Sequence, residues 1–405
     1  MVINGIYGTT QLTISYKPNC LTLSVAISGA NNVFSYDLEG RLWTAMVRGK
    51  SYRRGLNGKI VAKWIEPENV HQRRWLELPE TAQLQEEARS VVQNLYAAIQ
   101  MDQAHLDQAL PLSAQSAFAK AAQFDLSRYQ ADVLQYKRVY KPVGILPPDQ
   151  YMALVLQATE GCSFNTCTFC NFYRDRPFQI KNPDNFRTHI ENICEFLGAG
   201  ISLRRTIFLG DANALVIPMP RLEQLIKIIH AQLEVKSLGG IYAFLDGFSG
   251  ERKLPADYRV LAELGLKRIY IGMESGNEEL LRFLKKPGKA EDLIRAVRSI
   301  KAGGIAVGII ILLGAGGRQY ARGHVDDTVQ SINAMQLDAD DLIYFSELIE
   351  SEGMEYTRDA YRAALSPLTA IQRIAQGKEI EDRLIFNTRA GTPHISRYDI
   401  RDFVY

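Results

Sequence analysis

Three of the chain's five cysteines lie close together in the sequence. Cys162, Cys167 and Cys170 form a C-x4-C-x2-C spacing within the stretch "GCSFNTCTFCNFYRDRP", residues 161–177. Thiols at such short spacing can bind zinc, form a redox pair or hold an iron–sulfur cluster. We therefore expect this loop to be the centre of the function.

The three kinds of site differ in the ligands they need. Structural zinc uses four ligands, usually in two spaced pairs, and a fourth ligand here would have to be His189, Cys194 or the distant Cys20. A redox pair of Cys167 and Cys170 leaves the first cysteine of the loop without a role. An iron–sulfur cluster uses all three thiolates, and a four-iron cluster so held leaves one iron open to another ligand. The cluster is the interpretation that fits best.

The composition of the chain is that of an ordinary globular protein. Its 405 residues are 46% hydrophobic and 23% charged, with a formal net charge of +2. The net charge predicts no general attraction to nucleic acid or membranes, and apolar runs such as 304–317 are too short to span a bilayer. No secretion signal is visible at the N-terminus, and five cysteines, an odd number and mostly clustered, do not indicate a disulfide framework. We expect a cytoplasmic protein with reduced thiols.

The second half of the chain alternates apolar strands with amphipathic helices. Strand patterns cover residues 151–159, 205–211, 240–246, 267–274, 305–314 and 340–348. Six strands separated by helices predict an α/β fold with parallel pairing, and the strands are nearly continuously apolar, as strands covered by helices should be. A partial (β/α)6 barrel suits this regular alternation, and a doubly wound sheet is the alternative. In a barrel, the cysteines would follow the first strand at the rim where catalysis is built.

The first third of the chain has a different pattern. Short alternating runs broken by turn residues predict a β-rich region from Ile3 to Ile65, with a hairpin turning at Asn57-Gly58. A helical pattern follows over about 79–138, and three prolines in 140–149 indicate a linker. We expect an N-terminal β-rich and then helical domain at 1–140, a barrel at 141–350 and a C-terminal helical extension at 351–405.

One segment of the N-terminal region is rich in positive charge. Residues 47–64 contain six basic side chains and no acid, with Tyr52 and Trp64 among them. Such a segment is typical either of an exposed, solubilising hairpin or of a surface that binds phosphate, carboxylate or RNA. The basic residues are Arg48, Lys50, Arg53, Arg54, Lys59 and Lys63.

The cysteine loop and two later motifs resemble a known superfamily. The loop, with Phe169 before the last cysteine, resembles the radical S-adenosylmethionine (radical SAM) superfamily, in a branch with one extra residue in the first gap. "YIGMESGNEELLRFLKKP" and "ILLGAGGRQYARGHVDDTVQSINAM" resemble the fourth and fifth strand segments of the branch related to oxygen-independent coproporphyrinogen oxidase and the Elongator catalytic subunit. The resemblance covers about residues 152–348.

The resemblance implies the cofactors, the chemistry and the partners. The three cysteines would hold a [4Fe–4S] cluster whose fourth iron binds S-adenosylmethionine. One electron from an external donor, a flavodoxin or ferredoxin, would yield a 5′-deoxyadenosyl radical that abstracts hydrogen from the substrate. Such an enzyme is expected to be oxygen-sensitive. A small metabolite or a cofactor or natural-product precursor is the expected substrate. The alternatives are modification of RNA or protein, or a non-catalytic iron–sulfur or zinc-binding module.

The resemblance also suggests residues that bind the cofactor. Gly210, Asp211 and Asn213 stand where the family usually has a Gly-Gly-Glu-like turn that receives the cofactor's amino group. Glu274 matches an acidic position that meets the ribose or amino-acid portion, and Ser275 shapes the following turn. For each acid, the structural alternative is a turn or a helix cap.

Two further positions would lie on the adenine side of the cofactor. Gly314, followed by Gly316 and Gly317, comes after the fifth strand, where a backbone without side chains would let the cofactor approach. Phe169 would be the apolar neighbour of the adenine, and its alternative role is packing beneath the cysteine loop.

Overall fold

The structure is a computed structural model that describes residues 1–27, 29–67, 70–247, 253–351, 353–387 and 389–405. The chain divides into two compact units. The first comprises Met1–Met152, Glu191–Arg205 and Arg401–Tyr405, and the second comprises Ala153–Ile190 and Thr206–Ile400. Helix α4 (Pro183–Leu197) runs from the second unit into the first.

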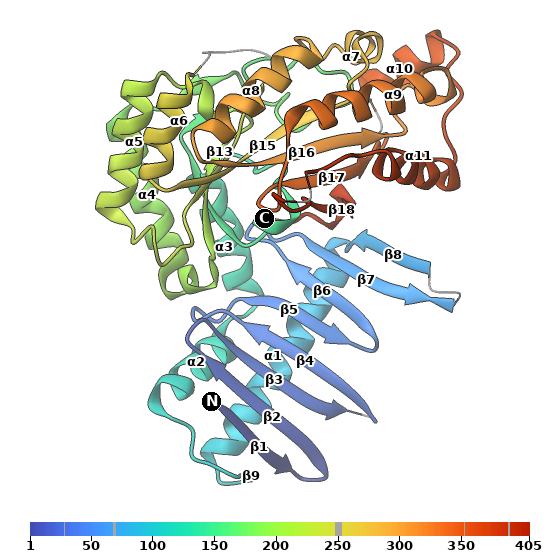
Figure 1. The fold of residues 1–405 in the computed structure, drawn as a ribbon. Coiled ribbons are helices and arrows are strands. Elements are labelled where there is room, and N and C mark those ends of the chain that lie inside the picture. The colour runs from blue at the N-terminus through green and yellow to red at the C-terminus, as the bar shows by residue number, and fades with distance from the viewer. Residues whose placement is uncertain (28, 68–69, 248–252, 352, 388) are drawn as a thin grey trace. The chain divides into compact units, whose positions relative to one another are not determined.

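The first unit contains a nine-stranded antiparallel sheet in the order β8-β7-β6-β5-β4-β3-β2-β1-β9 (Figure 1). Eight strands follow one another as a meander, and the short β9 pairs with β1 at the far edge. This confirms the β-rich N-terminal region and its antiparallel hairpins. The strands are β1 (Val2–Tyr7), β2 (Thr10–Lys17), β3 (Cys20–Ile27), β4 (Ala30–Tyr36), β5 (Leu42–Val47), β6 (Lys50–Arg54), β7 (Ile60–Glu66), β8 (Val70–Trp75) and β9 (Ala104–Leu106).

Three helices of the first unit follow the meander, as the helical pattern predicts: α1 (Leu78–Gln100), α2 (Leu112–Gln123) and α3 (Leu126–Val139). Alternate strand residues such as Ile14 and Phe34 are fully buried in one apolar core with Ala88 and Val92 of α1. The hydroxyl of Tyr36 donates to the carbonyl of Ala88 at 2.7 Å, which fixes the helix on the sheet. The predicted hairpin is present between β6 and β7, and Gly58 has a φ of 83° in its turn.

The second unit contains a parallel seven-stranded sheet in the order β10-β13-β14-β15-β16-β17-β18. Six strands correspond to the predicted ones, so the α/β class with a parallel sheet is confirmed. Neighbouring strands follow the chain order with no reversal, whereas a doubly wound sheet reverses its order at a switch point. Right-handed crossovers therefore place the helices on one face, as in a barrel. The strands are β10 (Ala153–Gln157), β13 (Thr206–Gly210), β14 (Ile241–Phe244), β15 (Leu266–Glu274), β16 (Ala306–Leu313), β17 (Leu342–Glu347) and β18 (His394–Tyr398).

The seventh strand, β18, was missed by the sequence analysis, which expected only helices after residue 350. It pairs in parallel with β17, from His394 opposite Leu342 to Tyr398 opposite Ser346. Its five residues, "HISRY", are polar and partly exposed, because the strand lies at the sheet edge. An edge strand of this kind lacks the apolar run that identified the other six.

The helices of the second unit lie between the strands in sequence (Figure 1). The virtual Cβ of Gly247 would contact Leu293 of α8 and Ile271 of β15, so Ile271 faces the helices. Tyr270, the preceding residue, instead packs against Phe208 and Phe244 on the other face. Besides α4, the helices are α5 (Met219–Gln232), α6 (Pro255–Glu263), α7 (Glu278–Phe283), α8 (Ala290–Ala302), α9 (Gly317–Met335), α10 (Glu355–Arg362) and α11 (Ala370–Asp382).

Candidate active site

The cysteine loop is closed at its base by a short antiparallel ribbon. Strand β11 (Thr159–Glu160) leads into the loop and pairs with β12 (Gln179–Ile180), which leads out of it. Gly161 has a φ of 78°, and a Cβ there would lie 2.9 Å from the carbonyl oxygen of Pro177. Only a residue without a side chain suits this close approach. The loop therefore begins and ends at one point beside the carboxyl end of β10.

Asp211 holds both ends of this loop. Its carboxylate accepts hydrogen bonds from the Gly161 amide at 3.0 Å and the Gln157 side chain at 2.9 Å, and it pairs with Arg176 at 3.2 Å. Burial raises the pKa of Asp211, in spite of these three donors. In this structure the Asp211 carboxylate joins the start of the loop to its end.

Asn213 extends the same connection to the next strand. Its side-chain amide donates to Ser163 Oγ at 3.0 Å in the cysteine loop, and its side-chain oxygen accepts from the Asp246 amide at 3.0 Å. Asn213 is almost completely buried. The segment after β13, with Gly210 at its strand end, thus links the loop to the carboxyl end of β14.

The far side of the cysteine loop is fixed by residues that follow α7. The amide of Thr168 donates to the Leu284 carbonyl at 3.0 Å, and the Thr166 hydroxyl donates to the Lys285 carbonyl at 3.2 Å. Within the loop, Arg174 donates to the carbonyls of Cys167 and Cys170 at 2.8 and 3.3 Å. These bonds hold the loop against the segment that carries Lys286.

The three thiols lie near enough to affect one another electrostatically. Burial raises the pKa of Cys170 to about 12 and that of Cys167 to about 11, and the neighbouring thiols contribute to both shifts. Thiols in this state stay protonated at neutral pH unless cations compensate their charge, and iron in a cluster supplies that compensation. Three soft thiol donors on one loop are a donor set that fits an iron–sulfur cluster.

In the described residues, neither the three thiols nor other side chains are gathered into a group of three or more His, Cys, Asp or Glu that could hold a metal ion. His189, one candidate for a fourth zinc ligand, accepts a hydrogen bond from the Gln157 amide through Nε2 at 3.0 Å. Cys20, another candidate, lies buried in the antiparallel sheet, where its sulfur is 4.0 Å from Thr22 Oγ1.

Glu274 ends β15 in an unusual conformation. The pairing of β15 with β16 is irregular between Gly272 and Glu274, and Glu274 has a φ of 62°. A bulge of this kind redirects a side chain at the end of a strand. The Glu274 carboxylate lies over Gly272, where an added Cβ would be 2.4 Å from Oε1. The position thus depends on a glycine beneath it.

Lys286 is the partner of Glu274, with Nζ 3.3 Å from Oε1, and both side chains are largely buried. Burial raises the pKa of Glu274, although Lys286 opposes this. Burial alone would lower the pKa of Lys286, but Glu274, Cys167 and Asp246 outweigh it and raise the pKa. The lysine therefore lies within the electrostatic reach of a cysteine and two acids.

The turn after Glu274 is bound to helix α9. Ser275 Oγ lies 2.7 Å from Nδ1 of His324, and the Gly276 amide donates to Thr328 Oγ1 at 2.9 Å. A Cβ at Gly276 would lie 2.1 Å from the Asp327 carbonyl oxygen. Ser275 and Gly276 shape the turn, and α9 holds its form.

Phe169 and the glycines after β16 are surrounded by the chain's own atoms. Phe169 packs against an apolar cluster that includes Leu284 and Tyr356. The Gly314 amide donates to the Gln376 side chain at 2.9 Å, and a Cβ there would lie 2.7 Å from Arg373 of α11. In this structure the close approach at Gly314 is made by a helix of the protein.

Sequence reasoning missed Lys286 and Asp246. Asp246 lies two residues after β14, and Asp211 lies one residue after β13, so an acid close after each of two strands was a usable signal. Lys286 lies in the quoted motif "YIGMESGNEELLRFLKKP", but its neighbour Lys285 is exposed and looks the same in the sequence. Only the fold distinguishes the two lysines.

A comparison with protein families matches a large part of the second unit. Residues 156–327 match the family model described as the Radical SAM superfamily. The chain carries a radical SAM domain. Members of this superfamily use a [4Fe–4S] cluster and S-adenosylmethionine as a general property. No curated protein matches the sequence.

Solved structures of radical SAM enzymes are similar to the chain at low identity. Coproporphyrinogen III oxidase (HemN) from Escherichia coli has 11% identity and a TM-score of 0.43, over 61% of this chain and 54% of that one. Methylornithine synthase (PylB) has 18% identity and a TM-score of 0.40, over 58% of this chain and 63% of that one. Streptococcus suis SuiB has 12% identity and a TM-score of 0.39, over 87% of this chain and 72% of that one. The radical SAM chain thus spans about half of the oxidase and less than two thirds of the synthase.

One negative finding concerns membranes. Among the described residues, no helix is both long enough and apolar enough to cross a bilayer.

Proposed function

We propose that this protein is a radical SAM enzyme. It would reductively cleave S-adenosylmethionine, and the resulting radical would abstract hydrogen from a small molecule. The observation that carries the proposal is the meeting of the cysteine loop with Glu274, Lys286 and Asp246 at the carboxyl ends of β14 and β15. When bound there, the [4Fe–4S] cluster and S-adenosylmethionine would supply a 5′-deoxyadenosyl radical. Cys162, Cys167 and Cys170 are the proposed ligands of the cluster.

The chain's own residues would keep the three thiols in place. Asp211 bonds to both ends of the loop, and Arg174 fixes the carbonyls of Cys167 and Cys170. A loop held at its base and at its tip leaves the ligands little freedom to reorganise, which favours one binding geometry. We assign Asp211 this positioning role, and the amino-group contact inferred for Gly210, Asp211 and Asn213 stays a proposal.

The charges beside the loop suit the cofactor. Two acids, Glu274 and Asp246, and one base, Lys286, lie within electrostatic reach of one another beside the cysteine loop. S-adenosylmethionine carries a sulfonium, an ammonium and a carboxylate, and its net charge is positive. We propose that the acids bind the cationic groups and that Lys286 binds the carboxylate. Ser275, Gly314 and Phe169 stay proposed as neighbours of the cofactor.

A redox partner and a substrate complete the proposal. The reaction needs one electron per cleavage, and a flavodoxin or a ferredoxin is the proposed donor. For the substrate we favour a small molecule over RNA, because most of the basic residues in 47–64 have partners within the protein. Arg48 pairs with Glu87 at 2.9 Å, and Arg54 pairs with Asp132 at 2.9 Å.

The proposal is tested by the spectrum of the reduced protein. Anaerobically reconstituted protein should hold about four irons per chain. Its paramagnetic resonance spectrum after dithionite reduction should change when S-adenosylmethionine is added. The variants C162A, C167A and C170A should lose the iron, whereas the matched variants C20A and C194A should keep it. A loaded and reduced cluster whose spectrum is indifferent to S-adenosylmethionine would contradict the proposal.

A further inference from the structure

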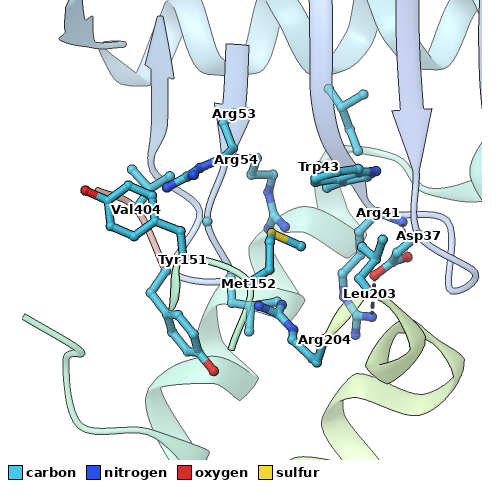
Figure 2. A pocket seen from close by; sticks show the side chains of 14 residues that line it. Asp37, Arg41, Trp43, Arg53, Arg54, Tyr151, Met152, Leu203, Arg204 and Val404 are labelled. Atoms are coloured by element: carbon cyan, nitrogen blue, oxygen red, sulfur yellow. Dashed lines mark hydrogen bonds and ion pairs between the residues drawn. The ribbon is translucent and has the colours of Figure 1, made fainter. Parts of the chain in front are cut away.

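A small cavity in the first unit is lined by four arginines. It measures about 30 Å³ and lies at the ends of β5 and β6 (Figure 2). Arg41, Arg53 and Arg54 come from the segments before and within these strands, and Arg204 comes from the segment after α4. Figure 2 shows Arg53 and Arg54 approaching from the strand and Arg204 from the opposite side.

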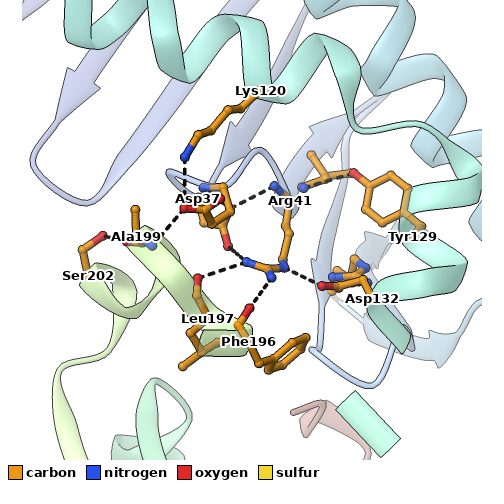
Figure 3. A network of polar contacts seen from close by, with 12 residues as sticks. Asp37, Arg41, Lys120, Tyr129, Asp132, Phe196, Leu197, Ala199 and Ser202 are labelled. Atoms are coloured by element: carbon orange, nitrogen blue, oxygen red, sulfur yellow. Dashed lines mark hydrogen bonds and ion pairs between the residues drawn. The ribbon is translucent and has the colours of Figure 1, made fainter. Parts of the chain in front are cut away.

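Two of the four arginines are neutralised by buried acids (Figure 3). Arg41 contacts Asp132 at 2.6 Å and Asp37 at 3.3 Å, and Arg54 contacts Asp132 at 2.9 Å. All four of these side chains are at least nine-tenths buried. The positive charges of the two guanidinium groups equal the negative charges of the two carboxylates, so this network has no net formal charge.

Arg53 and Arg204 have no such acid. The Arg53 guanidinium donates to the Asp402 backbone carbonyl at 3.2 Å. It also stacks on Tyr151, with the Cζ of Arg53 4.6 Å from the centroid of the tyrosine ring. Arg204 lies over the Tyr405 ring at 5.4 Å. Among the described residues, neither guanidinium forms an ion pair with a carboxylate. The Asp402 carboxylate nearby is already paired with Lys63 at 2.9 Å.

The two unpaired arginines repel each other. Burial lowers the pKa of Arg53, Tyr151 and the Asp402 carboxylate oppose this, and the positive charge of Arg204 lowers the pKa further. Three buried nitrogen donors beside the cavity also have no hydrogen-bond partner in the described part of the chain, namely Nε of Arg54, Nε of Arg204 and Nε1 of Trp43. Buried donors without partners and buried like charges both cost stability unless something binds them.

We propose that this cavity binds a small oxyanion, a carboxylate or a phosphate group of a small molecule, through Arg53 and Arg204. A volume of about 30 Å³ holds roughly two water molecules, which is the size of the two oxygens of a carboxylate. Planar guanidinium groups match the geometry of carboxylate and phosphate oxygens. The residues all belong to the first unit, so the inference goes beyond the proposed radical chemistry and does not depend on it.

The proposal assigns a role to part of the basic segment at 47–64. Arg48 lies at the surface with Glu87, and Lys50 and Lys59 stack over Trp64 and Trp75. Arg53 alone among the six basic residues both lines the cavity and has no carboxylate partner in the described residues. We thus expect ligand binding to depend on Arg53 and to be indifferent to Arg48.

The test is a titration of the full chain with inorganic phosphate and, separately, acetate at constant ionic strength. The chain has three tryptophans, and the indole ¹⁵N–¹H signal of Trp43 should shift while that of Trp64 stays in place. Bound anion should also raise the melting temperature. The two titrations distinguish a phosphate site from a carboxylate site, and a response to either supports the proposal.

Variants locate the binding. R53Q and R204Q should each weaken affinity by about ten- to a hundredfold, because each loses charge-assisted hydrogen bonds. R48Q, in the same basic segment, should bind like the unmodified protein. The proposal is overturned if neither anion moves the Trp43 signal at millimolar concentration, or if R48Q weakens binding as much as R204Q. The wild-type titration stands even if a variant fails to fold.

Discussion

The side chains that set the chemistry of the site are few, and several are buried with charge. Glu274 is the most informative of them, because it is buried, has a positive φ and has Lys286 as an ion-pair partner. A buried carboxylate is costly unless it is paired or binds something. Lys286 also interacts electrostatically with Asp246, so Glu274 is one of two acids near the same lysine.

Replacing Glu274 by glutamine should weaken the binding of S-adenosylmethionine without removing the iron–sulfur cluster. We expect E274Q to weaken S-adenosylmethionine binding by about ten- to a hundredfold, since a charge-assisted hydrogen bond is lost. Its iron content should stay unchanged, because the proposed partner of Glu274 is the cofactor. Binding is measured by equilibrium dialysis, and E279Q, an exposed change on α7, is the control. Equal affinity in the two variants would refute the role given to Glu274.

His324 should make stability depend on pH. Burial lowers its pKa to about 4, so the folded protein favours the neutral ring. A depressed pKa contributes stability that is present above the ordinary value of about 6.5 and is lost as pH falls toward 4. Between pH 7 and pH 5 the loss from this residue should be about 2 kcal/mol.

Urea unfolding at pH 7, 6 and 5 measures this dependence. H324N should lower stability at pH 7, because it disturbs the bond to Ser275, but should show a smaller fall between pH 7 and pH 5. An unchanged slope in the variant would show that other groups cause the fall.

At the scale of elements, the cysteine loop is the part whose geometry matters most. Asp211 is not a proposed iron ligand, yet it bonds to the start and the end of the loop. We expect D211A to reduce iron incorporation, because both loop ends are released and Arg176 loses a buried partner.

D175A is the matched control for D211A. Asp175 also pairs with Arg176, at 2.8 Å, but it is exposed and does not contact Gly161. Iron content after anaerobic reconstitution should therefore be normal in D175A and low in D211A. A full iron content in D211A would mean that the cysteine loop forms its binding geometry without the bonds from Asp211 to Gly161 and Arg176.

The elements of the parallel sheet were predictable because their strands are buried on both faces. β16, "AVGIIILL", is apolar along its whole length and could be read directly. The strands β18 and β9 could not be read in this way. β18 is a polar strand at the sheet edge, and β9 has three residues that pair with β1, about a hundred positions earlier in the sequence. The local pattern of residue types does not predict pairing between segments so far apart in the sequence.

The site was predictable to a similar degree. The cysteine spacing and Glu274 were visible in the sequence, because they are residue types at fixed intervals. The partners of Asp211 were not, since Gly161 and Arg176 meet it only after the loop closes on itself. Asn213 was likewise placed near the site, but its bonds to Ser163 and Asp246 depend on three separate strand ends.

For the whole molecule, helix α4 is the element shared by the two compact units. Within the first unit, the Arg41 guanidinium donates to the carbonyls of Phe196 and Leu197 at 2.6 and 3.3 Å (Figure 3). These two residues are the C-terminal end of α4. A positive charge at a helix C-terminus satisfies its last carbonyls and complements the helix dipole. Arg41 also neutralises Asp37 and Asp132.

Removing Arg41 should therefore destabilise the protein strongly. R41M leaves buried carboxylates without their main partner, and breaking a buried ion pair in this way costs about 3–5 kcal/mol. Chemical denaturation measures the loss. R48M removes an exposed arginine and should cost at most about 1 kcal/mol. A small effect of R41M would mean that the network contributes little to stability.

The central claim is that this protein cleaves S-adenosylmethionine at the three-cysteine loop. The direct measurement is chromatography of the products after the anaerobically reconstituted protein is reduced with dithionite in the presence of S-adenosylmethionine. We predict 5′-deoxyadenosine and methionine in equal amounts, formed slowly without substrate, and none from C170A. A protein that holds its cluster, accepts an electron and still yields no 5′-deoxyadenosine would contradict the account.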